Sequence, residues 1–170
     1  MVNTHFLVLT NVHPSAAAAY AVIMVNVAGG NVGTVSGTNA FLTVLADSNA
    51  NGIPDTWEST YFGSPTGADR NADSDGDGMS NWAEYVAGTN PTNAASYLKV
   101  EGITATGGAL ISFQAVSNRT YTVEYTDSLN PAAWTRLTDV TPRPADWTAT
   151  VPDLNPAPGR YYRLTTPRRQ

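Results

Sequence analysis

The sequence predicts a mainly β fold with two short helices near its middle. Short runs rich in Val, Thr and Tyr recur towards both ends of the chain and are separated by many of its 14 Gly and 11 Pro residues. This texture is typical of strands and turns rather than long helices. Hydrophobic residues make up 42% of the chain, which is enough for a packed core. We therefore expect three regions, 1–46, 47–95 and 96–170.

The first region, 1–46, is nearly free of charge. We expect three strands in its apolar runs 6–9, 20–27 and 41–45, because turn signals at 13–15 and 28–31 separate them. A helix starting in the alanines 16–19 is disfavoured by the β-branched residues that follow.

The third region, 96–170, contains six strand-like runs about ten residues apart. Gly, Pro and Asn separate them, as in an antiparallel β-sandwich. The middle run, 120–126, alternates Tyr and Val with Thr and Glu, which places the two kinds on opposite faces of a strand. The predicted strands are 97–103, 109–115, 120–126, 134–140, 147–153 and 160–166.

Composition excludes several classes of protein. The chain has no cysteine, so disulfides and Cys-ligated zinc are excluded. It lacks a basic stripe with interleaved aromatic residues, so we expect no nucleic-acid partner. The apolar run 16–25 is too short to span a membrane, and the first residues lack the basic segment of a signal peptide. His5 and His13 have no partner in register for catalysis, and no nucleophile motif occurs, so we expect no enzyme.

The acids are concentrated between residues 47 and 84, where eight acids accompany one base. Such crowding indicates either solvated acidic turns or a bound cation. The stretch DSDGDGMSNWAE, 73–84, has the EF-hand spacing D-x-D-x-D-G-x5-E, in which alternate acids face a hard cation and glycine allows the sharp turn. The predicted calcium ligands of this second loop are Asp73, Asp75, Asp77, Met79 (through its carbonyl), Asn81 and Glu84.

The same spacing occurs 26 residues earlier in DSNANGIPDTWE, 47–58. This recurrence favours two calcium ions, because solvated turns would not repeat Gly and Glu in phase, and magnesium prefers fewer protein ligands. We expect the second loop to fill first, since it has more carboxylates. A strand runs directly into the first loop, so a structural role is favoured over an EF-hand switch. The predicted ligands of the first loop are Asp47, Asn49, Asn51, Ile53 (through its carbonyl), Asp55 and Glu58.

Residues 47–93 resemble the thrombospondin type 3-like calcium repeats of secreted and surface bacterial proteins, which are related in pattern to dockerin loop–helix units. The resemblance implies calcium binding at the positions above and an extracellular or cell-surface location, with the export signal outside this sequence. Dockerins also bind cohesins through residues near their loop ends. The corresponding pairs here are Thr56 with Trp57 and Trp82 with Ala83, and cohesin binding is not carried over.

The flanking regions carry further resemblances. The first region is similar to the second half of an immunoglobulin-like domain, with Tyr20 at the tyrosine corner and Val22 in place of the second cysteine. The first half of such a domain is missing. Either the chain is a piece of a larger protein, or another copy or partner adds the missing strands, which repeated head to tail would give a filament.

The third region resembles the small carboxy-terminal β-sandwich modules of large exported bacterial proteins. Its aromatic residues either pack within the module or form a sugar-binding platform. The sequence thus predicts a calcium-stabilised structural module of an extracellular bacterial protein. A second interpretation with the same fold is a subunit that self-assembles into a filament or surface layer by strand complementation. The alternative is a carbohydrate-binding or adhesion appendage of a larger secreted enzyme or surface protein. The platform candidates are Trp134, Trp147, Tyr161 and Tyr162.

Overall fold

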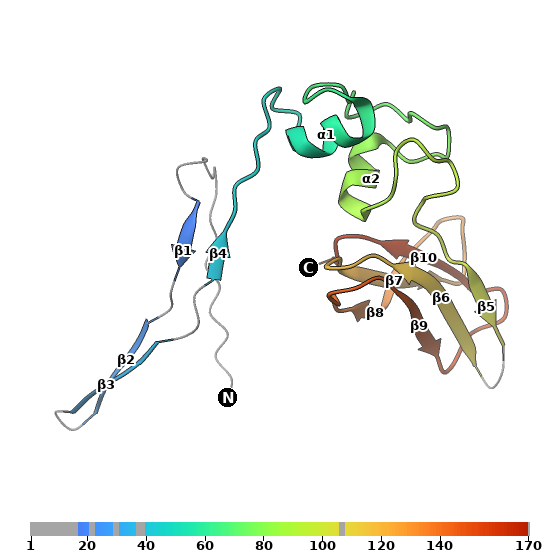
Figure 1. Ribbon diagram of the computed structural model, residues 1–170. Helices are drawn as coiled ribbons and strands as arrows, with labels where there is room; N and C mark the ends of the chain where they lie inside the picture. Colours follow the sequence, from blue (N-terminus) through green and yellow to red (C-terminus); the bar gives the residue numbers. More distant parts are fainter. Residues whose placement is uncertain (1–16, 21–22, 29–30, 37–39, 106–107, 170) are drawn as a thin grey trace.

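The structure is a computed structural model that describes residues 17–20, 23–28, 31–36, 40–105 and 108–169. In these described residues, four strands are followed by two helices and then by six strands. Figure 1 shows this order along the chain. The chain is therefore mainly β with two short helices, as the sequence predicts.

The first four strands form two separate antiparallel ladders. The outer pair joins β1 (Ala18–Tyr20) to β4 (Ala40–Leu42), and the inner pair joins β2 (Ile23–Ala28) to β3 (Asn31–Ser36). The predicted strand at 6–9 and the histidines lie outside the described residues. The sequence did not predict β3, and the expected strand at 41–45 ends at Leu42. The immunoglobulin-like arrangement of this region stays a prediction.

The two helices are short and similarly terminated. Helix α1 (Asp55–Phe62) and helix α2 (Asn81–Ala87) each end at a glycine in the left-handed conformation, Gly63 at φ 72° and Gly88 at φ 80°. Glycine adopts this conformation without steric cost. Ser80 caps α2 by accepting a hydrogen bond from the backbone N–H of Ala83 at 3.3 Å.

The last six strands form two three-stranded antiparallel sheets, in the orders β5-β6-β9 and β10-β7-β8. Five of the six predicted runs coincide with strands. The first is displaced, because β5 covers Gly102–Thr104 instead of 97–103. The strands are β5 (Gly102–Thr104), β6 (Ala109–Ala115), β7 (Tyr121–Thr126), β8 (Thr135–Val140), β9 (Trp147–Asp153) and β10 (Tyr161–Thr165).

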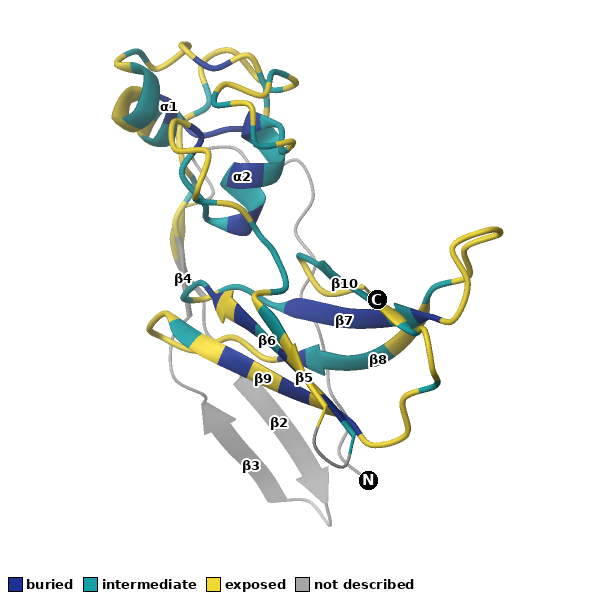
Figure 2. Cartoon of the chain, turned by 90° about the vertical axis from the view of Figure 1, so that its right-hand side faces the viewer, coloured by how far each residue is buried: buried dark blue, intermediate teal, exposed yellow. Residues whose placement is uncertain are grey.

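Residues from both sheets share one buried hydrophobic cluster. Phe113 of β6 meets Tyr121 of β7 edge to face, with ring centroids 5.1 Å apart. The hydroxyl of Tyr121 accepts a hydrogen bond from the N–H of Val116 at 2.8 Å, so this buried polar group is satisfied. Figure 2 shows that β7 is buried along nearly its whole length, whereas β9 alternates between buried and exposed residues.

The burial of β7 on both faces has a specific cause, since the end of the chain covers its polar face. Arg169 donates its backbone N–H to the hydroxyl of Thr122 at 3.0 Å. Glu124, 3% exposed, is paired with Arg163 at 2.7 Å and Arg169 at 3.2 Å. A buried carboxylate is tolerated when it is paired in this way.

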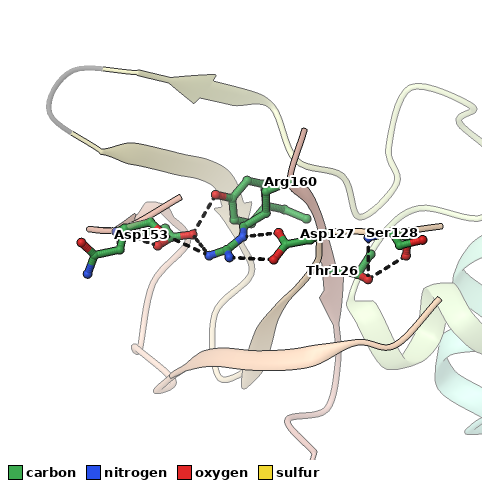
Figure 3. Close-up of polar contacts among 7 residues, drawn as sticks. Thr126, Asp127, Ser128, Asp153 and Arg160 are labelled. Carbon is green, nitrogen blue, oxygen red and sulfur yellow. Dashed lines mark hydrogen bonds and ion pairs between the residues drawn. The ribbon is translucent and has the colours of Figure 1, made fainter. Parts of the chain in front are cut away.

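A second ion network joins the ends of three strands through Arg160 (Figure 3). The guanidinium donates two hydrogen bonds to Asp127, at 2.7 and 3.0 Å, and one to Asp153 at 2.9 Å. It also lies over the ring of Tyr125, 3.9 Å from the centroid. The hydrogen bonds from Arg160 lower the pKa of Asp127 below its usual 3.8. Partial burial, and then the hydrogen bond to Asp153, raise the pKa of the Tyr162 hydroxyl to about 12.

The helical segment contacts the carboxy-terminal sheets directly. Arg119, between β6 and β7, donates to the carbonyl of Tyr85 in α2 at 3.0 Å. The backbone N–H of Leu98 donates to the sulfur of Met79 at 3.4 Å. Helix α2 therefore lies between the acidic loops and the β sheets.

Candidate metal centre

The two acidic loops have the same backbone geometry. In each, the glycine at position 6 donates its N–H to the first aspartate: Gly52 to Asp47 at 2.8 Å, and Gly78 to Asp73 at 2.9 Å. Both glycines have positive φ, 87° and 98°, which explains why Gly recurs there. The internal duplication predicted from spacing is therefore present in the fold of the loops.

The second loop brings three carboxylates together. Oxygen atoms of Asp73, Asp75 and Asp77 all lie within 4.8 Å of one another. Asp73 accepts backbone hydrogen bonds, whereas Asp75 and Asp77 each keep one buried oxygen, Oδ2, without a partner among the described residues. Buried acceptors are rarely left unpaired, so this loop requires an additional positive or donating group.

Glu84, in the first turn of α2, lies outside this group of three, but it is near enough to Asp75 and Asp77 for their charges to act on it. It is fully buried, and only the hydroxyl of Thr89 donates to its Oε1, at 3.3 Å. Its Oε2 has no partner among the described residues. Burial, and then the negative charges of Asp75 and Asp77, raise the pKa of Glu84 to about 7. These oxygen ligands fit a calcium ion, which would both pair the orphaned atoms and neutralise the repulsion.

The remaining two predicted ligands of the second loop are Asn81 and Met79, and the structure shows what their side chains contact. Asn81 is buried, and its Nδ2 donates to the carbonyl of Asp69 at 2.7 Å, which leaves its Oδ1 unpartnered among the described residues. Met79 directs its sulfur towards Leu98 at the sheets. The use of the Met79 carbonyl as a ligand stays a prediction.

The first loop brings amide and backbone N–H groups to a buried carboxylate, that of Glu58. Glu58 is fully buried, as Glu84 is. Its Oε1 accepts hydrogen bonds from the amide nitrogens of Asn49 and Asn51, at 3.3 and 3.2 Å, and from the backbone N–H of Ala68 at 3.0 Å. Its Oε2 has no partner in the described part of the chain.

Asp55, at position 9 of the first loop, is not joined to this group. Both its carboxylate oxygens accept hydrogen bonds from Ser48, from the N–H at 2.7 Å and from the hydroxyl at 2.6 Å. The hydroxyl bond, followed by the backbone bond, lowers the pKa of Asp55. Ile53, at position 7, buries its side chain completely.

Sequence reasoning missed the segment that connects the loops. Arg70 donates to the carbonyl of Asn51 at 2.6 Å, and its guanidinium lies 3.9 Å from the centroid of the Trp82 ring. As the single base in the acidic region, Arg70 was visible in the sequence as a candidate link. Thr89, the partner of Glu84, follows the glycine that ends α2, and no sequence pattern marked it as a contact of the loop.

The candidate sugar-platform residues are largely engaged within the fold. Arginine guanidiniums lie over the rings of Trp134 and Trp147, 4.2 and 3.6 Å from the centroids. Tyr162 donates its hydroxyl to Asp153, and Tyr161 is 46% exposed. Trp134, Trp147 and Tyr162 thus make contacts within the fold, and the sugar-binding platform stays a prediction.

Comparison with known proteins gives one match. Residues 73–94 match the family model described as the bacterial TSP3 repeat. Neither the curated proteins nor the solved structures contain a match to this chain. No helix in the described residues is long and apolar enough to cross a membrane. The matched segment holds the second loop, α2 and the turn after it, so the predicted thrombospondin type 3-like repeat is confirmed over residues 73–94.

Proposed function

We propose that this chain is a calcium-stabilised structural module of an extracellular bacterial protein. The observation that carries the proposal is the set of buried, unpartnered carboxylate oxygens on Asp75, Asp77 and Glu84. They lie in the segment that matches the bacterial TSP3 repeat, a repeat typical of extracellular proteins.

The ion would be held by side-chain oxygens of Asp73, Asp75, Asp77 and Glu84 and by the carbonyl of Met79. Asn81, at position 9, suits an indirect contact through water. Calcium supplies positive charge at a place where four acids otherwise repel one another. The first loop, with Asp47 as its first acid, is a weaker second site.

Binding at the second loop has a structural consequence beyond the loop. Glu84 belongs to α2, and the carbonyl of the next residue, Tyr85, accepts a hydrogen bond from Arg119 beside β7. Fixing Glu84 therefore fixes α2 against the carboxy-terminal sheets. The role is a non-enzymatic one, in which the ion sets the path of the chain between its β regions.

The proposal extends to assembly at the first region. A two-stranded ladder is marginally stable by itself, and the described strands β1 to β4 form two such ladders with open edges. Added strands from a second copy or from the rest of a longer chain would complete them. Electron microscopy of the purified chain in calcium separates these two sources: filaments support strands from a second copy, and monodisperse monomers contradict that source.

Thermal melting in calcium and in chelator tests the calcium proposal. An ion at 100 times its dissociation constant stabilises the folded state by about 2.7 kcal/mol, so the melting temperature rises in calcium. Asp73→Ala combined with Asp75→Ala removes this rise, whereas the exposed control Glu101→Ala retains it. Equal melting of the wild-type chain in calcium and chelator would refute the proposal.

A further inference from the structure

We infer that the first loop keeps its folded form without calcium, because the amides of Asn49 and Asn51 take the place of the ion at Glu58. The inference rests on the proposed function only in taking the second loop as the calcium site. It assigns the two loops different roles: the first keeps its form with or without an ion, and the second is closed by the ion.

The difference is clearest at position 5 of the loops. Asn51 and Asp77 make the same turn, since each accepts a backbone hydrogen bond at 2.7 Å through Oδ1, from Ile53 and Met79 respectively. The second polar atom of the side chain differs between the two residues. Nδ2 of Asn51 donates to Glu58 at 3.2 Å, whereas Oδ2 of Asp77 is buried without a partner among the described residues.

Position 3 repeats the contrast. Asn49 and Asp75 each accept the N–H of the residue two places on, at 3.2 Å. Nδ2 of Asn49 then donates to Glu58 at 3.3 Å, and Oδ2 of Asp75 has no partner among the described residues. An amide can donate to a carboxylate, but a second carboxylate can only repel it.

Glu58 and Glu84 each keep a buried Oε2 without a partner among the described residues, and they differ at Oε1. Three N–H groups converge on Oε1 of Glu58, from Asn49, Asn51 and Ala68, against the single hydroxyl of Thr89 at Glu84. The partial positive charge of these three N–H groups faces Oε1 of Glu58. The first loop therefore has an internal substitute for a cation.

The closed first loop is also connected to the second. Asn51 donates its amide to the carbonyl of Ala68 at 3.3 Å, and the next carbonyl, that of Asp69, accepts from the amide of Asn81 at 2.7 Å. Residues 68–70 thus join the two loops. The first loop supplies a preformed support beside which the second loop orders when calcium binds.

Hydrogen exchange measured residue by residue by NMR tests the inference on the wild-type chain. The reporters are the N–H of Ala68, bonded to Glu58, and the N–H of Gly78, bonded to Asp73. On moving from calcium to chelator, the exchange of Ala68 is expected to change less than about threefold, and that of Gly78 to rise at least about tenfold. Equal acceleration at both reporters overturns the inference. No response at Gly78 instead contradicts the proposed function, so the two failures are distinguishable.

A pair of variants tests the role of the amides. Asn49→Asp with Asn51→Asp removes both donors, so Ala68 exchange in chelator is expected to rise at least about tenfold and to return towards the wild-type rate in calcium. Asn71→Asp with Asn155→Asp adds the same charge at exposed sites and should leave Ala68 unchanged. Retained protection of Ala68 in the first variant would overturn the inference.

Discussion

Replacing Glu84 with glutamine should stabilise the calcium-free chain and reduce its response to calcium. Glu84 is fully buried and faces the charges of Asp75 and Asp77, which together with burial raise its pKa from 4.5 to about 7. Glutamine has nearly the same shape and no charge, and its amide can donate to the orphaned oxygens.

The pKa gives the size of the effect. One pKa unit corresponds to about 1.4 kcal/mol, so ionised Glu84 destabilises the calcium-free fold by at most about 3.5 kcal/mol above pH 7. Screening by water around the exposed Asp73 reduces this figure, and we expect a gain of about 1–2 kcal/mol for Glu84→Gln at pH 8.

The sign of the pH dependence follows from linkage. Between pH 4.5 and 7 the folded state binds the proton of Glu84 more tightly than the unfolded state, so this residue lowers stability as pH rises through that window. Glu84→Gln removes this contribution.

Urea unfolding in chelator and in calcium measures both effects, with exposed Glu101→Gln as the control for loss of one charge. The variant should exceed the wild type in free energy of unfolding in chelator and gain less from calcium. A loss of about 1 kcal/mol or more in chelator would refute the account of Glu84 as an unsatisfied carboxylate.

Two further predictions concern the β sheets and their contact with α2. Because hydrogen bonds from Arg160 lower the pKa of Asp127, the stability they supply is present above pH 3.8 and is lost as pH falls below it. A melting series from pH 6 to 2 should show a smaller acid loss for Arg160→Met, and an unchanged loss would contradict this. Gly88→Ala should cost about 1–2 kcal/mol more than Gly63→Ala in denaturant unfolding. Both glycines have positive φ, but a methyl at Gly88 would lie 2.8 Å from a valine carbon, and one at Gly63 meets nothing. Equal losses would contradict the predicted clash.

The predictions from the sequence were most accurate for elements whose structure depends on residue spacing. The carboxy-terminal strands follow from alternation and regular punctuation, and the loop turns follow from Asp at position 1 with Gly at position 6. Strand β3 was not predicted, because its sequence, NVGTVS, has few large apolar residues. It forms a strand through its pairing with β2.

Side-chain partners were less accessible to sequence reasoning. Position 9 accepts several residue types, and only the structure shows that Asp55 turns to Ser48 while Asn81 turns to the carbonyl of Asp69. The asymmetry of the loops was likewise hidden, because Asn at positions 3 and 5 serves either as an oxygen ligand or as an amide donor. Contacts over long separations, such as Arg169 with Glu124, depend on how the chain end is placed.

Calorimetric titration with calcium of the wild-type chain and of Asp75→Asn with Asp77→Asn tests the central claim most directly. The double variant gives the second loop the amides that the first loop has, at nearly constant shape. The account predicts a binding event in the wild type, in a range of about 10⁻⁴ to 10⁻³ M or tighter, that is lost or strongly weakened in the variant. Absence of binding to the wild type at millimolar calcium, or equal binding by both chains, would contradict it.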